Sequence, residues 1–240
     1  MTIDPNSDIS KSAINRAGDA LRDWWLGPLD EPGNPFPLEP ANALFLFRAE
    51  FQTPMKKVTV GVRQFVDRER DPATRITVSQ RLKRAPQIIV KLTRHPNMKL
   101  SRMQDIGGCR AILQDDDEVM RVAARIERNW IVKHRKHYTL TEPADSGYRA
   151  LHIVVERAGR LIEIQLRTPS QHEWAEAVER TDKRLRLDLK SGHGPPQLLR
   201  YFRLAADGLA MEDAGVVPPE EFMQEFGHVQ EAAKPYFERR

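Results

Sequence analysis

A clean alternation of apolar and polar residues runs from Leu161 to Thr168. The apolar positions are Ile162, Ile164 and Leu166, and the intervening positions are Glu163, Gln165 and Arg167. This period of two predicts a β-strand with one face on a hydrophobic core. The other face carries a carboxylate, an amide and a guanidinium in succession. It fits a cleft that handles an anionic substrate through a cation, and equally an ordinary solvated sheet face.

Similar patterns predict helices at both ends of the chain and mixed strands and helices between them. A loop rich in proline and glycine is expected over residues 27–40. Apolar residues at helical spacing predict helices over about residues 10–25, 41–51, 54–65, 86–94, 115–128, 170–186, 197–211 and 218–237. Strand patterns cover residues 75–83, 107–113, 130–133, 151–157 and 161–167, and residues 134–148 are expected to form a polar connection.

This order of elements describes an α+β fold, with a mixed β-sheet flanked by helices. We expect residues 1–70 to form an N-terminal helical extension, residues 71–190 the sheet-containing core, and residues 191–240 a C-terminal helical extension. A chain of 240 residues can bury one substantial core.

Composition narrows the class of protein without defining its chemistry. With 40% hydrophobic and 30% charged residues, the chain has the composition of a soluble globular protein. A formal charge of +4 is compatible with a polyanionic ligand such as a nucleotide or RNA. The single cysteine, Cys109, excludes a disulfide within the chain and tells against a structural zinc site. The first residues show no apolar signal segment, and the longest apolar run, Ala43 to Phe47, is too short to span a bilayer, so a cytoplasmic protein without a membrane partner is expected.

Basic residues near the first strand are candidates for binding a polyphosphate. Arg81 and Lys83 share one face of that strand, and Lys91 follows on the next helix. Arginine offers planar bidentate contacts to phosphate and lysine offers a point charge. A solvated basic edge strand would show the same pattern.

Two carboxylates from distant strands are candidates for a shared Mg²⁺ ion. Asp105 directly precedes the strand over 107–113, which contains Arg110, and Glu163 lies on the strand described first. Phosphoryl transfer requires a metal, cations on the moving group and an oriented hydroxyl, whose proton a nearby carboxylate can take. Asp105 could instead cap a helix or loop, as aspartate often does.

A glycine and an aromatic residue precede the fourth strand. Gly147 frees the backbone, and Tyr148 could offer its ring as a stacking face for a base, or could anchor the loop. His152 could donate to a phosphate or be satisfied within the sheet.

Together these residues resemble the synthetase domain of the RelA/SpoT family, in order and spacing, over roughly residues 75–179. The matching motifs are Arg81-x-Lys83-x-x-x-Gln87-Ile88-x-x-Lys91, Asp105-Ile106-Gly107-Gly108-Cys109-Arg110, Gly147-Tyr148-Arg149-Ala150-Leu151-His152 and Glu163-Ile164-Gln165-Leu166-Arg167-Thr168, followed by His172 and Ala175-Glu176. The resemblance implies a nucleotidyltransferase-like fold. It also implies an activity that moves the β,γ-diphosphate of ATP to a ribose 3′-hydroxyl with Mg²⁺.

The resemblance also implies a role for each matching residue. Asp105 and Glu163 would bind the metal, and Glu163 would also serve as the base. The ATP-binding residues would be Arg81, Lys83, Lys91 and Arg110. Tyr148 would stack on the acceptor base, and the acceptor side would be lined by His152, Gln165 and Arg167. Nothing in the chain resembles the family's hydrolase domain, so it looks like a small member with the synthetase alone.

The sequence departs from the family at Gln87, where many members carry serine, and in the loop before Tyr148. Members that use GDP or GTP typically have Pro-Lys-Pro-Asn-Gly-Tyr there, whereas residues 143–148 are Pro-Ala-Asp-Ser-Gly-Tyr. GTP or GDP, giving (p)ppGpp, is the first expectation for the acceptor. The alternative is a toxin that modifies the 3′ CCA end of tRNA. Its basic surface would include Lys56-Lys57, residues 133–136 and the run from Lys183 to Lys190.

A third reading, from a different class, is a non-catalytic module that binds nucleotide or RNA. The C-terminal helices could serve a homo-oligomer, cover the cleft or dock an antitoxin, and the sequence leaves these open.

Overall fold

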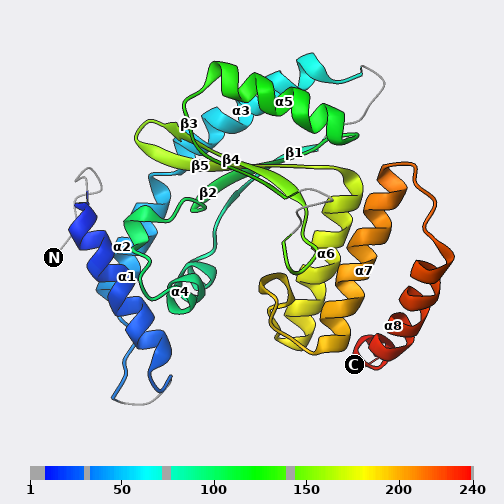
Figure 1. Ribbon diagram of the computed structural model, residues 1–240. Helices are drawn as coiled ribbons and strands as arrows, with labels where there is room; N and C mark the ends of the chain where they lie inside the picture. Colours follow the sequence, from blue (N-terminus) through cyan, green and yellow to red (C-terminus); the bar gives the residue numbers. More distant parts are fainter. Residues whose placement is uncertain (1–8, 30–32, 72–76, 139–143, 239–240) are drawn as a thin grey trace.

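The computed structural model describes residues 9–29, 33–71, 77–138 and 144–238. Helices surround one five-stranded sheet (Figure 1). The helices are α1 (Lys11–Leu26), α2 (Leu38–Ala49), α3 (Gln52–Glu69), α4 (Ala85–Arg94), η1 (Leu100–Arg102), α5 (Asp116–Asn129), α6 (Pro169–Leu185), η2 (Leu189–Ser191), α7 (Pro196–Asp213) and α8 (Glu220–Glu238). In the part of the chain that is described, no helix is both long and apolar enough to cross a membrane.

The sheet is mixed, in the order β1-β2-β5-β4-β3. Its strands are β1 (Thr77–Leu82), β2 (Gly107–Ile112), β3 (Val132–Tyr138), β4 (Ala150–Arg157) and β5 (Arg160–Arg167). Strands β2 and β5 are parallel, and every other neighbouring pair is antiparallel. The strand β5 therefore lies at the centre, between β2, which carries Arg110, and β4, which carries His152.

The strand register gives the sheet one apolar and one polar face. Cys109 of β2, Ile164 of β5 and Ile153 of β4 are aligned and buried on the apolar face. Two neighbouring rows cross the other face: Arg81, Gly108, Glu163 and Val154 in one, and Ser79, Arg110, Gln165, His152 and Lys136 in the next. Residues from distant parts of the sequence are therefore adjacent on a single polar surface.

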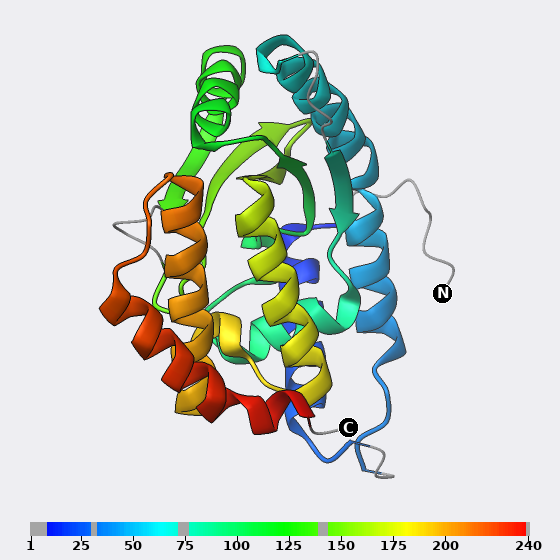
Figure 2. The ribbon, with the colours of Figure 1, turned by 90° about the vertical axis from the view of Figure 1, so that its right-hand side faces the viewer.

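Helices cover the two faces in different ways. The helices α3 and α5 lie across the apolar face and form the main core with it (Figure 1). On the polar side, α1, α2 and α4 lie at one end of the sheet and α6, α7 and α8 at the other (Figures 1 and 2). A second apolar cluster, which includes Tyr148, Trp174 and Phe202, joins α6 and α7 to the start of β4. The polar face therefore opens between two groups of helices.

Local sequence explains where the helix beside this opening begins. Thr168 and Gln171 form a capping box at the N-terminus of α6, and Pro169 occupies the first turn, where a missing N–H costs nothing. Because Thr168 directly follows β5, the chain turns at once from the central strand into α6.

The prediction of an α+β fold with a mixed sheet flanked by helices is confirmed, with two local errors. The third strand was predicted over 130–133 and a polar connection after it, but β3 continues to Tyr138. An edge strand with exposed charged residues shows no apolar alternation, so the end of this strand could not be predicted from the sequence. The helix α2 begins at Leu38, inside the predicted loop, because Pro40 is tolerated in a first helical turn. Two residues of the first predicted strand, 75–76, lie outside the described residues, as does the stretch that follows the predicted boundary at 70/71. The division into three units stays a prediction.

Candidate active site

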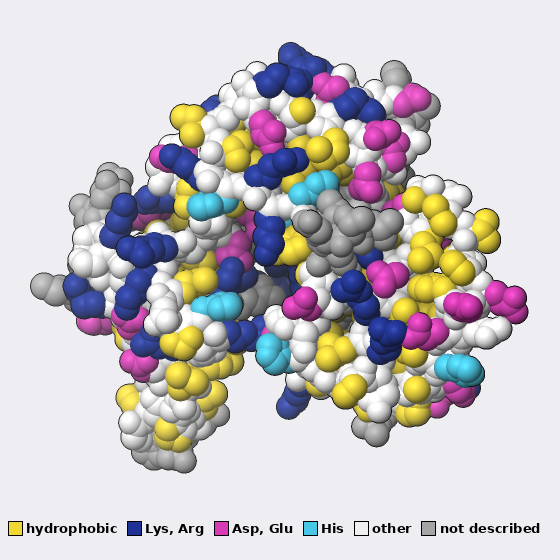
Figure 3. Space-filling model, viewed as in Figure 1, with side chains coloured by type: hydrophobic (Ala, Val, Ile, Leu, Met, Phe, Trp, Pro, Cys, Tyr) yellow, Lys and Arg dark blue, Asp and Glu magenta, His cyan; other side chains and the backbone are white. Residues whose placement is uncertain are grey.

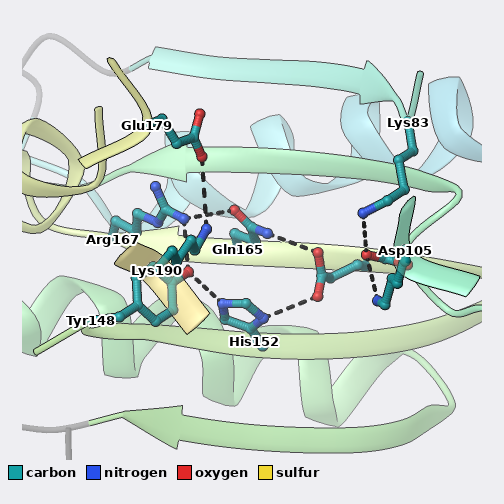
Figure 4. A network of polar contacts seen from close by, with 10 residues as sticks. Lys83, Asp105, Tyr148, His152, Gln165, Arg167, Glu179 and Lys190 are labelled. Atoms are coloured by element: carbon teal, nitrogen blue, oxygen red, sulfur yellow. Dashed lines mark hydrogen bonds and ion pairs between the residues drawn. The ribbon is translucent and has the colours of Figure 1, made fainter. Parts of the chain in front are cut away.

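The polar face of the sheet lies at the bottom of a hollow between the two groups of helices. Lys and Arg side chains surround this hollow on the surface (Figure 3). A network of polar side chains crosses it from Lys83 and Asp105 at one end to Arg167 and Lys190 at the other (Figure 4). The site therefore has two ends, which are described in turn.

Two lysines and one aspartate form the first end. Lys83, directly after β1, and Lys91, on α4, each donate a hydrogen bond of 2.8 Å to Oδ2 of Asp105. Burial by itself would raise the pKa of Asp105, but the two ammonium groups outweigh burial and hold the pKa below its ordinary value. Asp105 is therefore ionised at neutral pH.

The carboxylate of Glu163 is held on both oxygens. Oε1 lies 3.0 Å from Nδ1 of His152, and Oε2 accepts a hydrogen bond of 2.8 Å from the amide of Gln165. Burial would raise the pKa of Glu163, and nearby Asp105 acts in the same direction. The hydrogen bonds from His152 and Gln165 outweigh both effects, so the pKa lies below its ordinary value. Glu163 is therefore an ionised, oriented carboxylate close to Asp105.

Five side chains form a closed ring of hydrogen bonds on this face. Beyond Glu163, Nε2 of His152 lies 2.6 Å from the hydroxyl of Tyr148, and Arg167 donates to that hydroxyl at 2.7 Å and to Oε1 of Gln165 at 3.0 Å. Gln165 then returns to Glu163 (Figure 4). Since Glu163 only accepts, Nδ1 of His152 donates to it. The Tyr148 oxygen accepts from Arg167, and its contact with Nε2 of His152 closes the ring.

Tyr148 is buried, with 4% of its surface exposed. Gly147, at φ +89°, turns the chain into it, in a conformation that side chains other than glycine rarely adopt. Its ring contacts Tyr138 and Trp174 at their edges, and the ammonium of Lys190 lies 4.6 Å from the ring centroid. Burial raises the pKa of the Tyr148 hydroxyl, against the effect of Arg167. In this structure Tyr148 is an internal anchor, and its stacking role stays a prediction.

The remaining predicted residues lie at different depths. Arg81 is exposed on the edge strand β1. Arg110, on β2, is partly buried, and its Nη1 lies 3.4 Å from Nδ1 of His172. Arg167 was predicted on an open face but is fully buried under α6 and the segment after it. Lys190 was predicted only as part of a basic surface, because nothing in a loop sequence indicates that the lysine side chain returns to the sheet.

The two carboxylates fit a magnesium ion that is also held by substrate. Asp105 Oδ1 is buried and has no hydrogen-bond partner among the described residues, so one carboxylate oxygen is available for a ligand. Within the same residues no cluster of three metal-binding side chains occurs. Mg²⁺ typically takes one or two carboxylates and completes its shell with substrate phosphates and water. Asp105 and Glu163 suit that mode, and a closed metal centre made by the protein alone would need more ligands.

Glycine in β2 serves packing between strands. A Cβ atom at Gly108 would lie 3.1 Å from the backbone oxygen of Glu163, tighter than ordinary contact. Gly108 therefore lets β2 lie against the strand that carries Glu163. The spacing of these strands in turn affects how close Asp105 and Glu163 lie.

This fold and this face define a mixed-sheet protein with a cleft lined by cationic side chains. Residues 80–182 match the family described as a region found in RelA/SpoT proteins. The predicted resemblance is confirmed over this region, which includes Asp105, Tyr148 and Glu163.

Curated relatives and solved structures are also similar to this chain. An uncharacterized protein of Mycobacterium tuberculosis and one of Mycobacterium bovis are each 28% identical over 174 residues, 71% of this chain. The match spans 58% of the length of these curated relatives. Small alarmone synthetase 1 from Bacillus subtilis is similar with a TM-score of 0.58 at 24% identity, covering 79% of this chain and 99% of that one. A GTP pyrophosphokinase family protein from Streptococcus pneumoniae gives a TM-score of 0.54 at 24% identity, covering 77% and 95%. At these identities the solved structures establish the shared fold.

Proposed function

We propose that this protein is a Mg²⁺-dependent ATP pyrophosphokinase. The 3′-hydroxyl oxygen of an acceptor ribose attacks the β-phosphorus of ATP, and the bond between the α,β-bridging oxygen and the β-phosphorus breaks. AMP leaves, the β,γ-diphosphate is joined to the acceptor, and the hydroxyl proton passes to Glu163. The observation that carries the proposal is the placement of Lys83, Lys91 and Asp105 next to an ionised Glu163, inside the RelA/SpoT region.

The end of the cleft at Asp105 suits the triphosphate of ATP. Lys83 and Lys91 share one carboxylate, so one positive charge is left over, and each ammonium keeps further donors for phosphate oxygens. Arg81 and Arg110 project from β1 and β2 on the same face and would extend this cationic surface. When bound to Asp105 and Glu163, Mg²⁺ would neutralise charge on the transferred diphosphate.

The other end suits the acceptor. The hydrogen bonds from His152 and Gln165 fix the orientation of Glu163, so its carboxylate can receive a proton from a hydroxyl held beside it. A carboxylate with a lowered pKa is ionised at neutral pH, as a base must be before it acts. Catalysis would then rest on positioning and electrostatics, as in other phosphoryl transfers.

GTP or GDP is the first choice of acceptor, with (p)ppGpp as product. Small alarmone synthetase 1 from Bacillus subtilis has been solved with its product pppGpp, which supports this choice by similarity. The alternative, the 3′ CCA end of tRNA, is favoured by the loop before Tyr148, where Ala144 and Asp145 offer no positive charge. For this alternative, the exposed residues of the edge strand β3, including Lys133 and Lys136, would contact the RNA backbone.

One incubation distinguishes these functions. Purified protein receives Mg²⁺ and ATP labelled on the γ-phosphate, with GDP, GTP or bulk tRNA in parallel reactions. Label in ppGpp or pppGpp identifies an alarmone synthetase, and label on tRNA alone identifies a tRNA-modifying enzyme. Label in no acceptor would contradict the proposal and favour the non-catalytic binding module. The proposed antitoxin and homo-oligomer are separate predictions, to be tested by copurification and by mass in solution.

A further inference from the structure

The segment after α6 brings a lysine back to the sheet. Arg186, in the left-handed conformation at φ 56°, ends α6, and Gly192 at φ +80° ends the short helix η2 that contains Lys190. The backbone N–H of Leu189 donates to Asp182 at 2.7 Å, and Leu189 is itself buried. These contacts fold the segment under α6 and direct Lys190 toward the polar face (Figure 4).

An ion pair ties the same segment to the opposite side of the cleft. Arg94, at the end of α4, lies 2.8 Å from Asp188, two residues before Lys190. Since α4 also carries Lys91 of the proposed ATP end, the segment spans the opening between the two groups of helices. The position of Lys190 is thus set by contacts on both sides.

Charged groups of both signs surround Lys190. Its ammonium is 3.7 Å from Glu179 of α6 and 4.6 Å from the centroid of the Tyr148 ring. Burial, together with Arg167 and Arg110, lowers the pKa of Lys190 to about 8, against the attraction of Glu179 and Glu163. Glu163 already accepts hydrogen bonds from His152 and Gln165, so Lys190 pairs with Glu179 instead.

Buried guanidinium groups near Lys190 contain hydrogen-bond donors without partners among the described residues. Nε and Nη1 of Arg167, and Nε of Arg110, are buried without partners among the described residues. Arg167 is 0% exposed, so protein atoms there exclude the bulk solvent that would otherwise satisfy it. An unpaired buried donor is costly, more so when charged, and few occur in folded proteins. An anion with several oxygens is the ligand that a fork of guanidinium donors binds best.

We propose that Lys190 and Arg167 form a binding subsite for a phosphate group of the acceptor, with Lys190 as its specificity-determining residue. This inference rests on the proposed function, because it places the subsite at the acceptor end of the cleft. The loop before Tyr148 supplies no cation at residues 144–147, so the charge must come from another segment. The phosphate belongs either to the 5′ end of a free nucleotide or to a phosphodiester near an RNA 3′ end.

Binding measurements with three variants test the subsite. Lys190→Met removes the charge and keeps most of the apolar stem, Lys190→Arg keeps the charge, and Lys234→Met is the matched control. Lys234 lies on α8, 3.3 Å from Glu231, in an exposed ion pair of the same chemistry. Isothermal titration would compare GDP, guanosine, tRNA ending in CCA and the ATP analogue AMPCPP for each protein, and thermal melting would confirm that each variant is folded.

The subsite predicts a loss that is specific to the phosphate. Lys190→Met should weaken whichever acceptor the wild-type protein binds, GDP or tRNA, by about tenfold or more, the effect of one charge-assisted hydrogen bond. Guanosine and AMPCPP should bind as in the wild type, Lys190→Arg should largely restore affinity, and Lys234→Met should change nothing. Tight wild-type binding of GDP identifies the free nucleotide as the phosphate source, and tight binding of tRNA without GDP identifies the phosphodiester.

Other results would overturn the subsite. Unchanged or tighter acceptor binding by Lys190→Met would mean that Lys190 only holds its segment in place through Glu179. Equal weakening of GDP and guanosine would assign Lys190 to packing on the Tyr148 ring. The label-transfer assay with wild-type protein separates failure of the subsite from failure of the proposed function. If the wild-type enzyme is active but its acceptor affinity does not depend on Lys190, only the subsite is refuted.

Discussion

Glu163→Gln is the change that most directly tests the proposed chemistry. Glutamine has the size of glutamate, but its amide presents one acceptor and one donor group where the carboxylate presents two acceptors. In the structure both oxygens of Glu163 face donors, from His152 and from Gln165. The variant can therefore satisfy only one of these contacts without rearrangement.

The closed ring passes the mismatch on to its other members. If His152 changes tautomer to accept from the new amide, its Nε2–H must donate to Tyr148, and the tyrosine proton loses its acceptor. If Gln165 flips instead, its NH₂ group faces Arg167. Either way about one hydrogen bond is lost, at about 0.5–1.5 kcal/mol. The melting temperature should fall by about 2–4 °C per kcal/mol, so the variant remains folded.

Activity should fall far more than stability. The variant lacks the base, which typically contributes about 10²–10⁴-fold, and also one of the two proposed magnesium ligands. Transfer of label from γ-labelled ATP to the acceptor should thus drop by at least about 100-fold. AMPCPP binding, measured by titration, should be largely retained because Lys83 and Lys91 are intact.

The matched control is Glu156→Gln, an exposed glutamate near the end of the neighbouring strand β4, paired with Lys133 at 2.7 Å. It should lose at most about 1 kcal/mol of stability and no transfer activity. If Glu163→Gln retained activity within about tenfold of the wild type, well short of the loss of at least about 100-fold expected without the base, the assignment of Glu163 as base would be wrong.

Further predictions concern single side chains. Lys83→Met should lower kcat/KM for ATP by about 10–100-fold, and it should move the acid limb of the pH profile upward. The pKa of Asp105, which is ionised above its lowered value, rises when the largest charge lowering it is removed, so activity is lost at a higher pH as pH falls. Tyr148→Phe keeps the ring but removes the hydroxyl that His152 and Arg167 share, and should lower kcat/KM for the acceptor by about 3–10-fold without changing that for ATP. Burial raises the pKa of Cys109 to about 12, so a thiol reagent at pH 8 should label it only after denaturation, and rapid labelling of the native protein would contradict its burial. Because the pKa of Lys190 is about 8, GDP affinity measured across pH 7–9 should fall as pH rises through that value, and a flat profile in the wild type would count against its role.

Much of the secondary structure is visible in the sequence because each element carries its own periodic pattern. The positions predicted to face the core, Ile162, Ile164 and Leu166 in one element and Val119, Val122 and Ile126 in the other, are buried in β5 and α5. The prediction was weakest for β3, whose solvent-exposed charges follow no apolar pattern. Propensity and periodicity are local quantities, and they lose information wherever an element lies at an edge.

The sequence by itself determined the fold class, the resemblance to RelA/SpoT proteins and the candidate site residues, because ordered motifs keep their residue types and spacing whatever the packing. The tertiary structure alone decided how those residues meet. The register of β2, β5 and β4 closes the ring from Glu163 through His152 to Tyr148 and back through Arg167, and long-range packing buries the tyrosine ring. The same packing returns Lys190 to the sheet. Such contacts join residues far apart in the chain, so they depend on strand register and helix packing, which no local pattern contains.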